Sequence, residues 1–357
     1  MKIAIIGSSV AGATAALLLA NCADVVVYEK KAKNEVGKKL CANVVTSLFL
    51  EYAKKLGLTP GRCVIGKFSK AVFISKNNKT ALKTTEIKVD RQRFLHDIVK
   101  KAEKKAHFNF NTELTDFEMN GKFVLHLKSG KRKFTDTADI LIGADGALSK
   151  VAEKIGFKRD YFLCLQTEIP KSKLKIGLEK NSYRVYLGKE FGYYSYIFPY
   201  KNKAIIGTGD FPKNAKNKFE KFLKFLKIKN AKINGALIST PKPFKWRKNL
   251  FLIGDAGADV KFSGGGIIPA MMAAFGVRDA IVNNDFSKLR DINKRDFVNR
   301  LLMKAMMKMN DEEFNYLLEA LKDRKFSGIV DKRDKFELKE YSKMLDLRFL
   351  RFLPKIF

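Results

Sequence analysis

Long apolar runs, paired cysteines and clustered histidines are all missing from this 357-residue chain. Its longest apolar stretch, 11–20, falls well short of the roughly 20 residues that a membrane-spanning helix needs. Four cysteines, at positions 22, 41, 63 and 164, form no C-x-x-C pair, and the three histidines have no ligand spacing. These absences argue against a zinc site and a disulfide framework. No leader precedes the first expected strand, so we expect a cytoplasmic protein without a metal.

Acidic residues are also few: 37 Asp and Glu face 70 Lys and Arg, for a formal net charge of +33. A field of this size attracts an anionic partner at ordinary salt concentrations. Nucleic acid, acidic lipid headgroups and pyrophosphate compounds all fit, and so does a chain whose lysines only cover solvated faces. Charge alone does not choose among these alternatives.

Hydrophobic periodicity divides the chain into a discontinuous nucleotide-binding unit and two further regions. Helical spacing occurs at 45–56, 93–105, 219–228 and from 267 onward, whereas alternating runs at 108–110, 117–127 and 134–142 predict antiparallel strands. Aromatic and β-branched runs predict a second sheet within 161–209. We expect an α+β fold with a Rossmann-like domain (1–160 and 245–285), a sheet-based substrate domain (161–244) and a helical C-terminal region (286–357). The lysine-rich stretch 30–39 is expected to be an exposed loop.

A strand, a small-residue turn, a helix and a second strand ending on Glu29 open the chain. In a G-x-G-x-x-G turn the glycines allow a tight bend, a close approach to pyrophosphate and helix packing. Gly7 and Gly12 keep two of these positions, whereas Ser9 replaces the middle glycine. The following helix directs its N-terminal dipole at the same place, and Glu29 is placed to bind a ribose. The turn therefore predicts a dinucleotide site, with a structural β-α-β unit as the alternative.

Two more strands end on glycine and aspartate. The segment 139–151 runs into Asp145, and the segment 249–274 runs into Gly254 and Asp255. Either one alone is consistent with an ordinary strand-to-helix turn. Together with the first turn, they predict that three corners meet around one dinucleotide.

The corners occur in the order found in FAD-dependent oxidoreductases of the hydroxylase-like fold, and the chain resembles the geranylgeranyl reductases among them. "YSYIFPYKNKAIIGTG", 194–209, is similar to that family's Y-x-W-x-F-P and G-x-G pattern, with Tyr196 in place of tryptophan. "KKLCANVV" resembles the family's cysteine-containing loop beside the flavin, with Ala42 in place of glycine. Ala152 stands where the family often has arginine.

The resemblance implies a set of cofactor contacts. Ala11 and Glu29 would bind the adenosine half of FAD, Arg91 would reach toward the pyrophosphate, Asp255 would hold the linking sugar alcohol or phosphate, and Leu114 would touch the adenine through its backbone. The full set of expected cofactor residues is Gly7, Ser9, Ala11, Gly12, Glu29, Cys41, Ala42, Arg91, Leu114, Asp145, Gly254, Asp255, Gly265, Gly266 and Ile267.

The same resemblance implies substrate and catalytic residues. Expected substrate contacts are Tyr194, Tyr196, Phe198, Pro199, Gly207 and Gly209, and expected catalytic residues are Cys41 and Tyr196. The aromatic side chains of this set are equally consistent with ordinary sheet core.

The implied activity is the reduction of isolated double bonds in geranylgeranyl chains of prenyl lipids or prenyl pyrophosphate, as part of isoprenoid and phospholipid biosynthesis. The electron donor, NAD(P)H or ferredoxin, is left open, as is the oligomeric state. A flavin-dependent monooxygenase of the same fold and a basic RNA-associated flavoprotein are the alternatives, although no known RNA-recognition pattern is present. Lysines around Phe219, Phe222, Leu223 and Leu226, and the tail 347–357, suggest peripheral binding to an anionic membrane, with packing on the protein body as the alternative.

Overall fold

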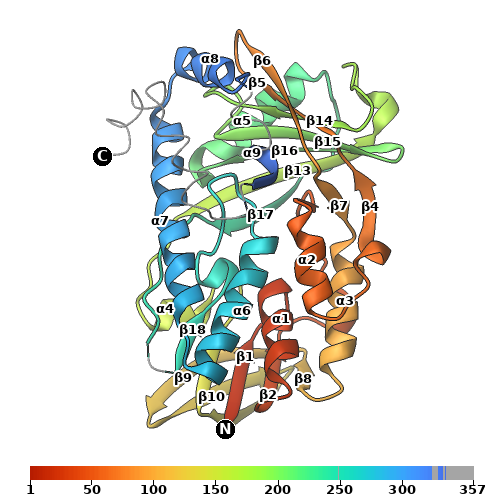
Figure 1. The fold of residues 1–357 in the computed structure, drawn as a ribbon. Coiled ribbons are helices and arrows are strands. Elements are labelled where there is room, and N and C mark those ends of the chain that lie inside the picture. Colours follow the sequence, from red (N-terminus) through yellow and green to blue (C-terminus); the bar gives the residue numbers. More distant parts are fainter. Residues whose placement is uncertain (248, 324–328, 333, 335–357) are drawn as a thin grey trace.

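The computed structural model describes residues 1–247, 249–323, 329–332 and 334. Figure 1 shows a parallel sheet and the N terminus at one end of the molecule and a large, mostly antiparallel sheet at the other, with the long helix α7 (Ser287–Lys308) along one side. The mixed α+β fold with a Rossmann-like part is therefore confirmed. No helix among the described residues is long and apolar enough to span a bilayer.

The parallel sheet has the strand order β18-β12-β1-β2-β8. Its strands are β1 (Lys2–Ile6), β2 (Asp24–Glu29), β8 (His107–Phe110), β12 (Ile140–Gly143) and β18 (Leu250–Leu252). The chain leaves β1 toward β2 on one side, while β12 and β18 lie on the other side. This places a topological switch point between β1 and β12, where doubly wound sheets bind ligands at the carboxyl ends of the strands.

Two layers cover this sheet because β1 presents alternate side chains to opposite faces. Ile3 and Ile5 pack under the helices α1 (Val10–Leu19), α3 (Arg91–Ala102) and α6 (Ile267–Asn283). Ala4 and Ile6 pack against a three-stranded antiparallel sheet. That sheet consists of β9 (Thr112–Asn120), β10 (Lys122–Ser129) and β11 (Arg132–Ala138).

The large sheet has seven strands in the order β17-β13-β16-β15-β14-β5-β6. They are β5 (Lys70–Ile74), β6 (Lys79–Lys83), β13 (Tyr161–Pro170), β14 (Ser182–Tyr186), β15 (Tyr194–Tyr200), β16 (Lys203–Asp210) and β17 (Asn234–Ser239). Helix α5 (Pro212–Phe225) covers one face, where it packs on Ile197 and Ile206. Tyr194, Tyr196 and Phe198 therefore lie on the opposite face.

Smaller elements connect these layers. They are the sheet of β3 (Val44–Val45), β7 (Ile87–Val89) and β4 (Val64–Lys67), the helices α2 (Leu48–Lys55), α4 (Lys150–Lys154), α8 (Asp311–Ala320) and α9 (Ile329–Lys332), and the 3-10 turns Lys33–Glu35, Pro60–Cys63, Lys171–Lys173 and Gly254–Ala256. Sheet β3-β7-β4 brings the loop before β3 close to the large sheet.

Several strand predictions differ from the structure. The run 108–110 and the end of the run 134–142 pair in parallel with β2 and β1 rather than antiparallel, whereas 134–138 pairs antiparallel with β10 as predicted. The run 117–127 divides into two strands at Gly121. Residues 70–83, expected in the nucleotide-binding part, join the large sheet because β5 pairs with β14. The stretch 30–39 is not simply an exposed loop, since it contains a 3-10 turn and buries Val36.

The apolar side chains expected to face a membrane from α5 and its C-terminal end are buried. Phe219, Phe222, Leu223 and Leu226 pack against the large sheet, so the packing alternative holds for all four. Phe225 is the exposed member of this helix, at 52%. The tail 347–357, for which membrane contact was also predicted, lies outside the described residues.

Candidate functional site

The first turn is built around two glycines that have no room for a side chain. Gly7 has φ +97°, and a Cβ there would lie 2.5 Å from the carbonyl oxygen of Ala144, at the end of β12. A Cβ at Gly12 would overlap the carbonyl oxygen of Gly7. These contacts hold the turn, α1 and the end of β12 together at the switch point, as a dinucleotide turn requires.

Ser9 fits this turn without strain. Its φ of −73° and ψ of −165° are extended values that any L-residue adopts, so the missing glycine is not needed for the backbone. The side chain is exposed and makes no capping bond to α1. The first N–H groups of α1 have no partner within the helix, and the Ser9 hydroxyl lies beside them. An anion at this end of α1 is therefore favoured.

Glu29 is held at the end of β2 by three hydrogen bonds. Its Oε2 accepts from the backbone N–H (2.7 Å) and the hydroxyl (3.0 Å) of Ser8, and its Oε1 accepts from the N–H of Lys31 (2.9 Å). A carboxylate accepts about four hydrogen bonds. The side chain is 8% exposed, and Oε1 keeps the capacity to accept one more bond, from a sugar hydroxyl.

The second and third corners reach the same place but differ in what their aspartates do. Gly254 has φ +65°, and a Cβ there would lie 3.0 Å from the Cβ of Ala11 in α1. Asp145 turns toward α4, where its Oδ2 accepts from the N–H of Lys150 (2.7 Å), and burial raises the pKa of this carboxyl. Ala11 and Gly254 thus meet, whereas a cofactor contact of Asp145 stays a prediction.

Asp255 forms an ion pair with Lys39, which is the main cause of a raised pKa of Lys39. The hydroxyl of Ser239 in β17 donates to the Asp255 carbonyl oxygen (2.6 Å), which ties this corner to the large sheet. Arg91 is buried and donates to the carbonyl oxygens of Gly37 (3.0 Å) and Lys39. Arg91 therefore orients the loop that carries Lys39, and its expected contact with pyrophosphate stays a prediction.

The glycine run before α6 meets the aromatic face of the large sheet. Gly264 has φ +79°, and a Cβ there would overlap the hydroxyl oxygen of Tyr194. A Cβ at Gly266 would lie 3.5 Å from Asp255 Oδ1. Helix α6 begins at Ile267, so its unpaired first-turn N–H groups and positive dipole end lie between Asp255 and Tyr194.

The Y-x-Y and G-x-G segments are cross-strand pairs. Tyr194 pairs with Gly209 and Tyr196 with Gly207 on the neighbouring strand β16. A Cβ at Gly207 would lie 2.8 Å from Tyr196 Cε2, and one at Gly209 would lie 2.7 Å from Tyr194 Cζ. Each ring therefore lies flat over the glycine opposite to it. The two rings stack with centroids 6.0 Å apart and form a continuous aromatic face.

Three polar residues at this face were not found by sequence analysis. Cys164 Sγ lies 3.5 Å from the Tyr194 hydroxyl, and Gln166 Oε1 accepts a 3.1 Å bond from the Tyr196 hydroxyl. Lys88 donates to the carbonyl oxygen of Ala42 (2.7 Å). Cys164 and Gln166 lie at alternate positions of β13, in a stretch that the sequence predicts to be a strand. No local sequence pattern singled out Lys88.

Burial shifts the acidity of these groups. It raises the pKa values of Tyr194 and Tyr196 well above their usual range and that of Cys164 to about 11, so all three keep their protons at neutral pH. Burial also lowers the pKa of Lys88 to about 8. Lys88 therefore gives up a proton more readily than an ordinary lysine.

Cys41 and Ala42 lie in the loop between Lys39 and β3. The N–H of Asn43 donates to Cys41 Sγ (3.3 Å). Ala42 does not adopt a positive φ, so alanine replaces the family's glycine without strain. Lys88 Nζ, which donates to the Ala42 carbonyl oxygen, lies 4.2 Å from the centroid of the Tyr200 ring. The loop therefore lies close to the Tyr200 end of the aromatic strand β15, and the expected position of Cys41 and Ala42 beside the flavin stays a prediction.

Three further predicted residues are buried or paired within the sheets. The side chain of Leu114 is buried between β9 and the parallel sheet. Phe198 packs on Tyr183, with centroids 4.7 Å apart, and Pro199 pairs with Ala204. Among the described residues, no group of three potential metal ligands occurs.

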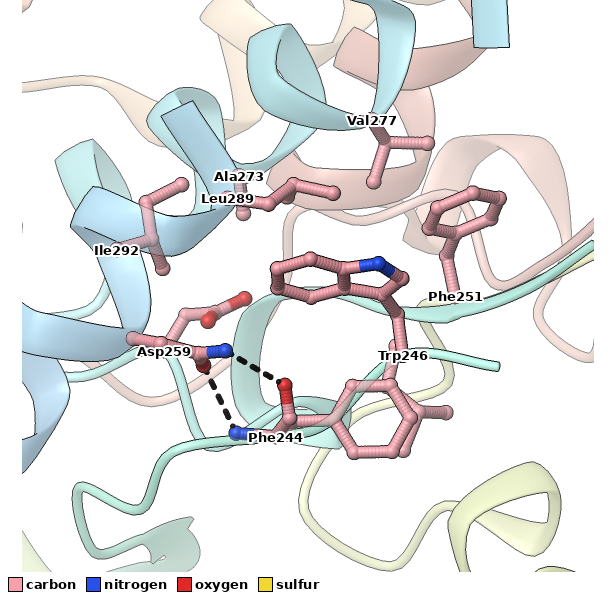
Figure 2. Close-up of a pocket in the computed structure, with 10 residues that line it drawn as sticks. Phe244, Trp246, Phe251, Asp259, Ala273, Val277, Leu289 and Ile292 are labelled. Carbon is pink, nitrogen blue, oxygen red and sulfur yellow. Dashed lines mark hydrogen bonds between the residues drawn. The ribbon is translucent and has the colours of Figure 1, made fainter. Parts of the chain in front are cut away.

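A separate cavity of about 20 Å³ lies between α6, α7 and β18 and contains none of the predicted site residues. Figure 2 shows the Trp246 ring at its centre, below Leu289 and Val277. The Asn293 side chain, which also lines the cavity, forms two hydrogen bonds with the backbone of Phe244. The size of the cavity suits about one water molecule. This cavity is therefore not the candidate site.

Three corners at a switch point, a fixed carboxylate at the end of β2 and a glycine-rich helix start define a dinucleotide-binding oxidoreductase fold. The model of the protein family described as "FAD binding domain" matches residues 1–204. The chain belongs to this family of FAD-binding proteins, and FAD is its cofactor. The resemblance to geranylgeranyl reductases is confirmed by the relatives that carry that name.

Two curated relatives match about half of the chain. A digeranylgeranylglycerophospholipid reductase of Methanocaldococcus jannaschii is 30% identical over 213 residues, which are 51% of this chain and 54% of the relative. A chloroplastic geranylgeranyl diphosphate reductase of Oryza sativa subsp. japonica is 28% identical over 50% of this chain and 43% of the relative. The matched parts therefore span only about half the length of these relatives.

Solved structures match almost the whole chain. A geranylgeranyl bacteriochlorophyll reductase-like protein of Thermoplasma acidophilum superposes with a TM-score of 0.78 at 18% identity, over 99% of this chain and 98% of that one. The flavin-dependent halogenase CmlS superposes with a TM-score of 0.69 at 15% identity, over 99% and 77%. At these identities the likeness concerns the fold.

Proposed function

We propose that the chain is an FAD-dependent reductase that saturates carbon–carbon double bonds of geranylgeranyl chains on a phospholipid or a pyrophosphate. One observation carries the proposal: the Tyr194 ring lies directly against Gly264, at the start of α6. An apolar aromatic surface therefore adjoins the glycine-rich helix start of the cofactor site. A substrate that lies on this surface reaches the cofactor corner beside the Tyr194 hydroxyl.

Bound FAD supplies the hydride for such a reduction once it is itself reduced. The chain's own groups provide the surroundings. The N-terminal end of α6 stabilises negative charge beside Asp255. The stacked rings of Tyr194 and Tyr196 exclude water and orient an apolar chain, which matters because an isolated alkene has no carbonyl to polarise. Cys41 and Tyr196 are the proposed residues nearest the reacting carbons, where a proton is needed.

Purified protein provides a direct test. We expect the visible spectrum of a bound flavin and, after reduction with dithionite, a mass increase of geranylgeranyl lipids by pairs of hydrogens. A preparation that cannot be loaded with FAD would contradict the proposal. If FAD-loaded protein consumes oxygen together with NAD(P)H and leaves prenyl lipids unchanged, the monooxygenase alternative takes its place.

Two glycine variants test whether the contact between Tyr194 and Gly264 is needed for activity. Gly264→Ala pushes the Tyr194 hydroxyl away and strains a backbone with φ +79°. Gly61→Ala has open space around the new Cβ. We expect the first variant to lose prenyl reduction and the second to keep it.

A further inference from the structure

Lys88, in β7, is a buried lysine without a carboxylate partner. The residue is 2% exposed, and its Nζ donates to the Ala42 carbonyl oxygen at 2.7 Å. No carboxylate oxygen lies within 4 Å of this Nζ among the residues that the structure describes. An ammonium group has three N–H donors, and a buried charge without a counter-ion is costly. The Ala42 oxygen satisfies one of these donors.

The other buried basic side chains among the described residues have different hydrogen-bond and ion-pair partners. Lys261 pairs with Asp334 at 2.7 Å, and Arg295 pairs with Asp296 at 2.8 Å. Arg91 donates to two backbone carbonyls. Among the described residues, Lys88 and Arg91 are thus the buried bases without an opposite charge in contact, and Lys88 donates to one backbone carbonyl where Arg91 donates to two.

Lys88 lies at one end of an aromatic row. Tyr194, Tyr196, Phe198 and Tyr200 occupy alternate positions of β15 and so lie on one face, over a length of about 20 Å. Gly264 and the start of α6 lie at the Tyr194 end. At the other end, Lys88 Nζ lies 4.2 Å from the centroid of the Tyr200 ring. The row therefore joins the cofactor corner to a buried positive charge.

The charged and titratable groups around Lys88 leave its charge uncompensated. Glu168, on β13, accepts hydrogen bonds from the Tyr200 hydroxyl and from Lys203 (2.7 Å), so its charge is already paired. Cys41, on the loop that ends at Ala42, is the other titratable neighbour. Among the described residues no carboxylate therefore contacts the Lys88 ammonium group, and the ring that lies beside it is Tyr200, at the end of the row.

We propose that Lys88 binds the phosphate group of a prenyl substrate, while the prenyl chain lies on the row from Tyr200 toward Tyr194. The inference rests on the proposed function and extends it to the recognition of the headgroup. A lysine ammonium is a compact point charge that binds phosphate without a fixed planar geometry. Anchoring the phosphate at this end would place double bonds farther along the chain at the cofactor corner. An isoprenoid without a phosphate would lack this anchor.

Binding measurements on FAD-loaded protein test the inference without turnover. Dissociation constants are measured by calorimetry for geranylgeranyl diphosphate, geranylgeraniol and inorganic pyrophosphate. We expect wild-type protein to bind the diphosphate roughly 10- to 100-fold more tightly than the alcohol, the range of one or two hydrogen bonds to a charged group. Lys88→Met should lose this preference and keep the affinity for the alcohol. Lys88→Arg should retain part of it, and exposed Lys104→Met should match wild type.

The pH dependence provides a second signature. The pKa of about 8 means that Lys88 is charged below this pH and neutral above it. A bound phosphate favours the charged form and moves the loss of charge in the complex to higher pH. The preference for the diphosphate should therefore decline above pH 8 in wild type but not in Lys88→Met.

Each contrary outcome has a distinct meaning. If Lys88→Met weakens both prenyl ligands equally, Lys88 only fastens the loop at Ala42, and the inference is overturned. A preference that persists in Lys88→Met also overturns it, because the anchor then lies elsewhere. If pyrophosphate alone binds as tightly as the prenyl ligand and depends on Lys88, the site serves free phosphate, and the headgroup assignment is overturned. Failure of the proposed function would instead appear as tight binding without reduction of either prenyl compound.

Discussion

Burial of Lys88 should destabilise the folded protein at neutral pH, and Lys88→Met should relieve this cost. Burial lowers the pKa of Lys88 from its usual 10.5 to about 8. At 1.36 kcal/mol for each pH unit, this corresponds to about 3 kcal/mol of stability lost wherever the lysine must be charged. The hydrogen bond to Ala42 returns about 1 kcal/mol, so we expect the variant to gain about 2 kcal/mol at pH 7.

The sign of the pH dependence follows from proton binding. Between pH 8 and 10.5 the unfolded chain binds more protons at this lysine than the folded chain does, so wild-type stability rises with pH over this window. Below about pH 8 the full cost is present, and above 10.5 it is absent. The advantage of Lys88→Met should therefore shrink across the window and reverse near its upper limit, where the variant lacks only the hydrogen bond to Ala42 and is less stable by about 1 kcal/mol.

Urea unfolding of FAD-loaded wild type, Lys88→Met and Lys104→Met at several pH values between 7 and 10 measures this difference. The free energy of unfolding of Lys104→Met, which removes an exposed lysine, should parallel wild type. A constant difference between wild type and Lys88→Met across the whole range would refute the reasoning. It would mean that Lys88 keeps an ordinary affinity for its proton in the folded state.

Three further predictions concern the cofactor turn and the aromatic row. Gly12→Ala forces a Cβ into the Gly7 carbonyl, so it should lower the free energy of unfolding by about 1–3 kcal/mol and weaken FAD binding. Ser9→Gly should bind FAD like wild type in a fluorescence titration. Gly207→Ala displaces the Tyr196 ring and should lower the unfolding temperature without loss of FAD, whereas Gly61→Ala should not. Tyr196→Phe removes one buried hydrogen bond and should cost about 1 kcal/mol in urea unfolding. The geometry is contradicted if Gly12→Ala behaves like Ser9→Gly or if Gly207→Ala behaves like Gly61→Ala. It is also contradicted if Tyr196→Phe costs no stability.

The cofactor corners could be predicted from sequence because their signals are local. A strand that ends on glycine and a short acid has a steric cause within a few residues, as at Gly7 and Gly254. The spacing from Pro199 to Gly207 and Gly209 was likewise visible, as part of the family resemblance, but not the pairing of Tyr196 with Gly207. Its physical reason, a ring that lies over the glycine opposite, needed the register of β15 and β16.

Features that depend on distant contacts could not be predicted in this way. Lys88 is one of 70 lysines and arginines, and its burial depends on which face of β7 meets Tyr200. Strands β5 and β6 join the large sheet through a parallel pairing of Lys70–Ile74 with Ser182–Tyr186, which no local periodicity indicates. The hydrogen bonds of Arg91 to the carbonyl oxygens of Gly37 and Lys39 likewise had no sequence signal, because they depend on where a loop more than 50 residues away lies.

Each of four sequence differences from the geranylgeranyl reductases has a physical explanation in the structure. Ser9 and Ala42 stand at glycine positions whose backbone does not require glycine. Ala152 is fully buried in α4, where it packs without a charge to satisfy. Tyr196, in place of tryptophan, covers Gly207 and donates to a neighbouring side chain. The first three changes leave the cofactor cradle intact, whereas Tyr196 alters the aromatic row itself. Any divergence of this chain from its relatives should therefore appear in which molecule lies on the aromatic row and not in the binding of FAD.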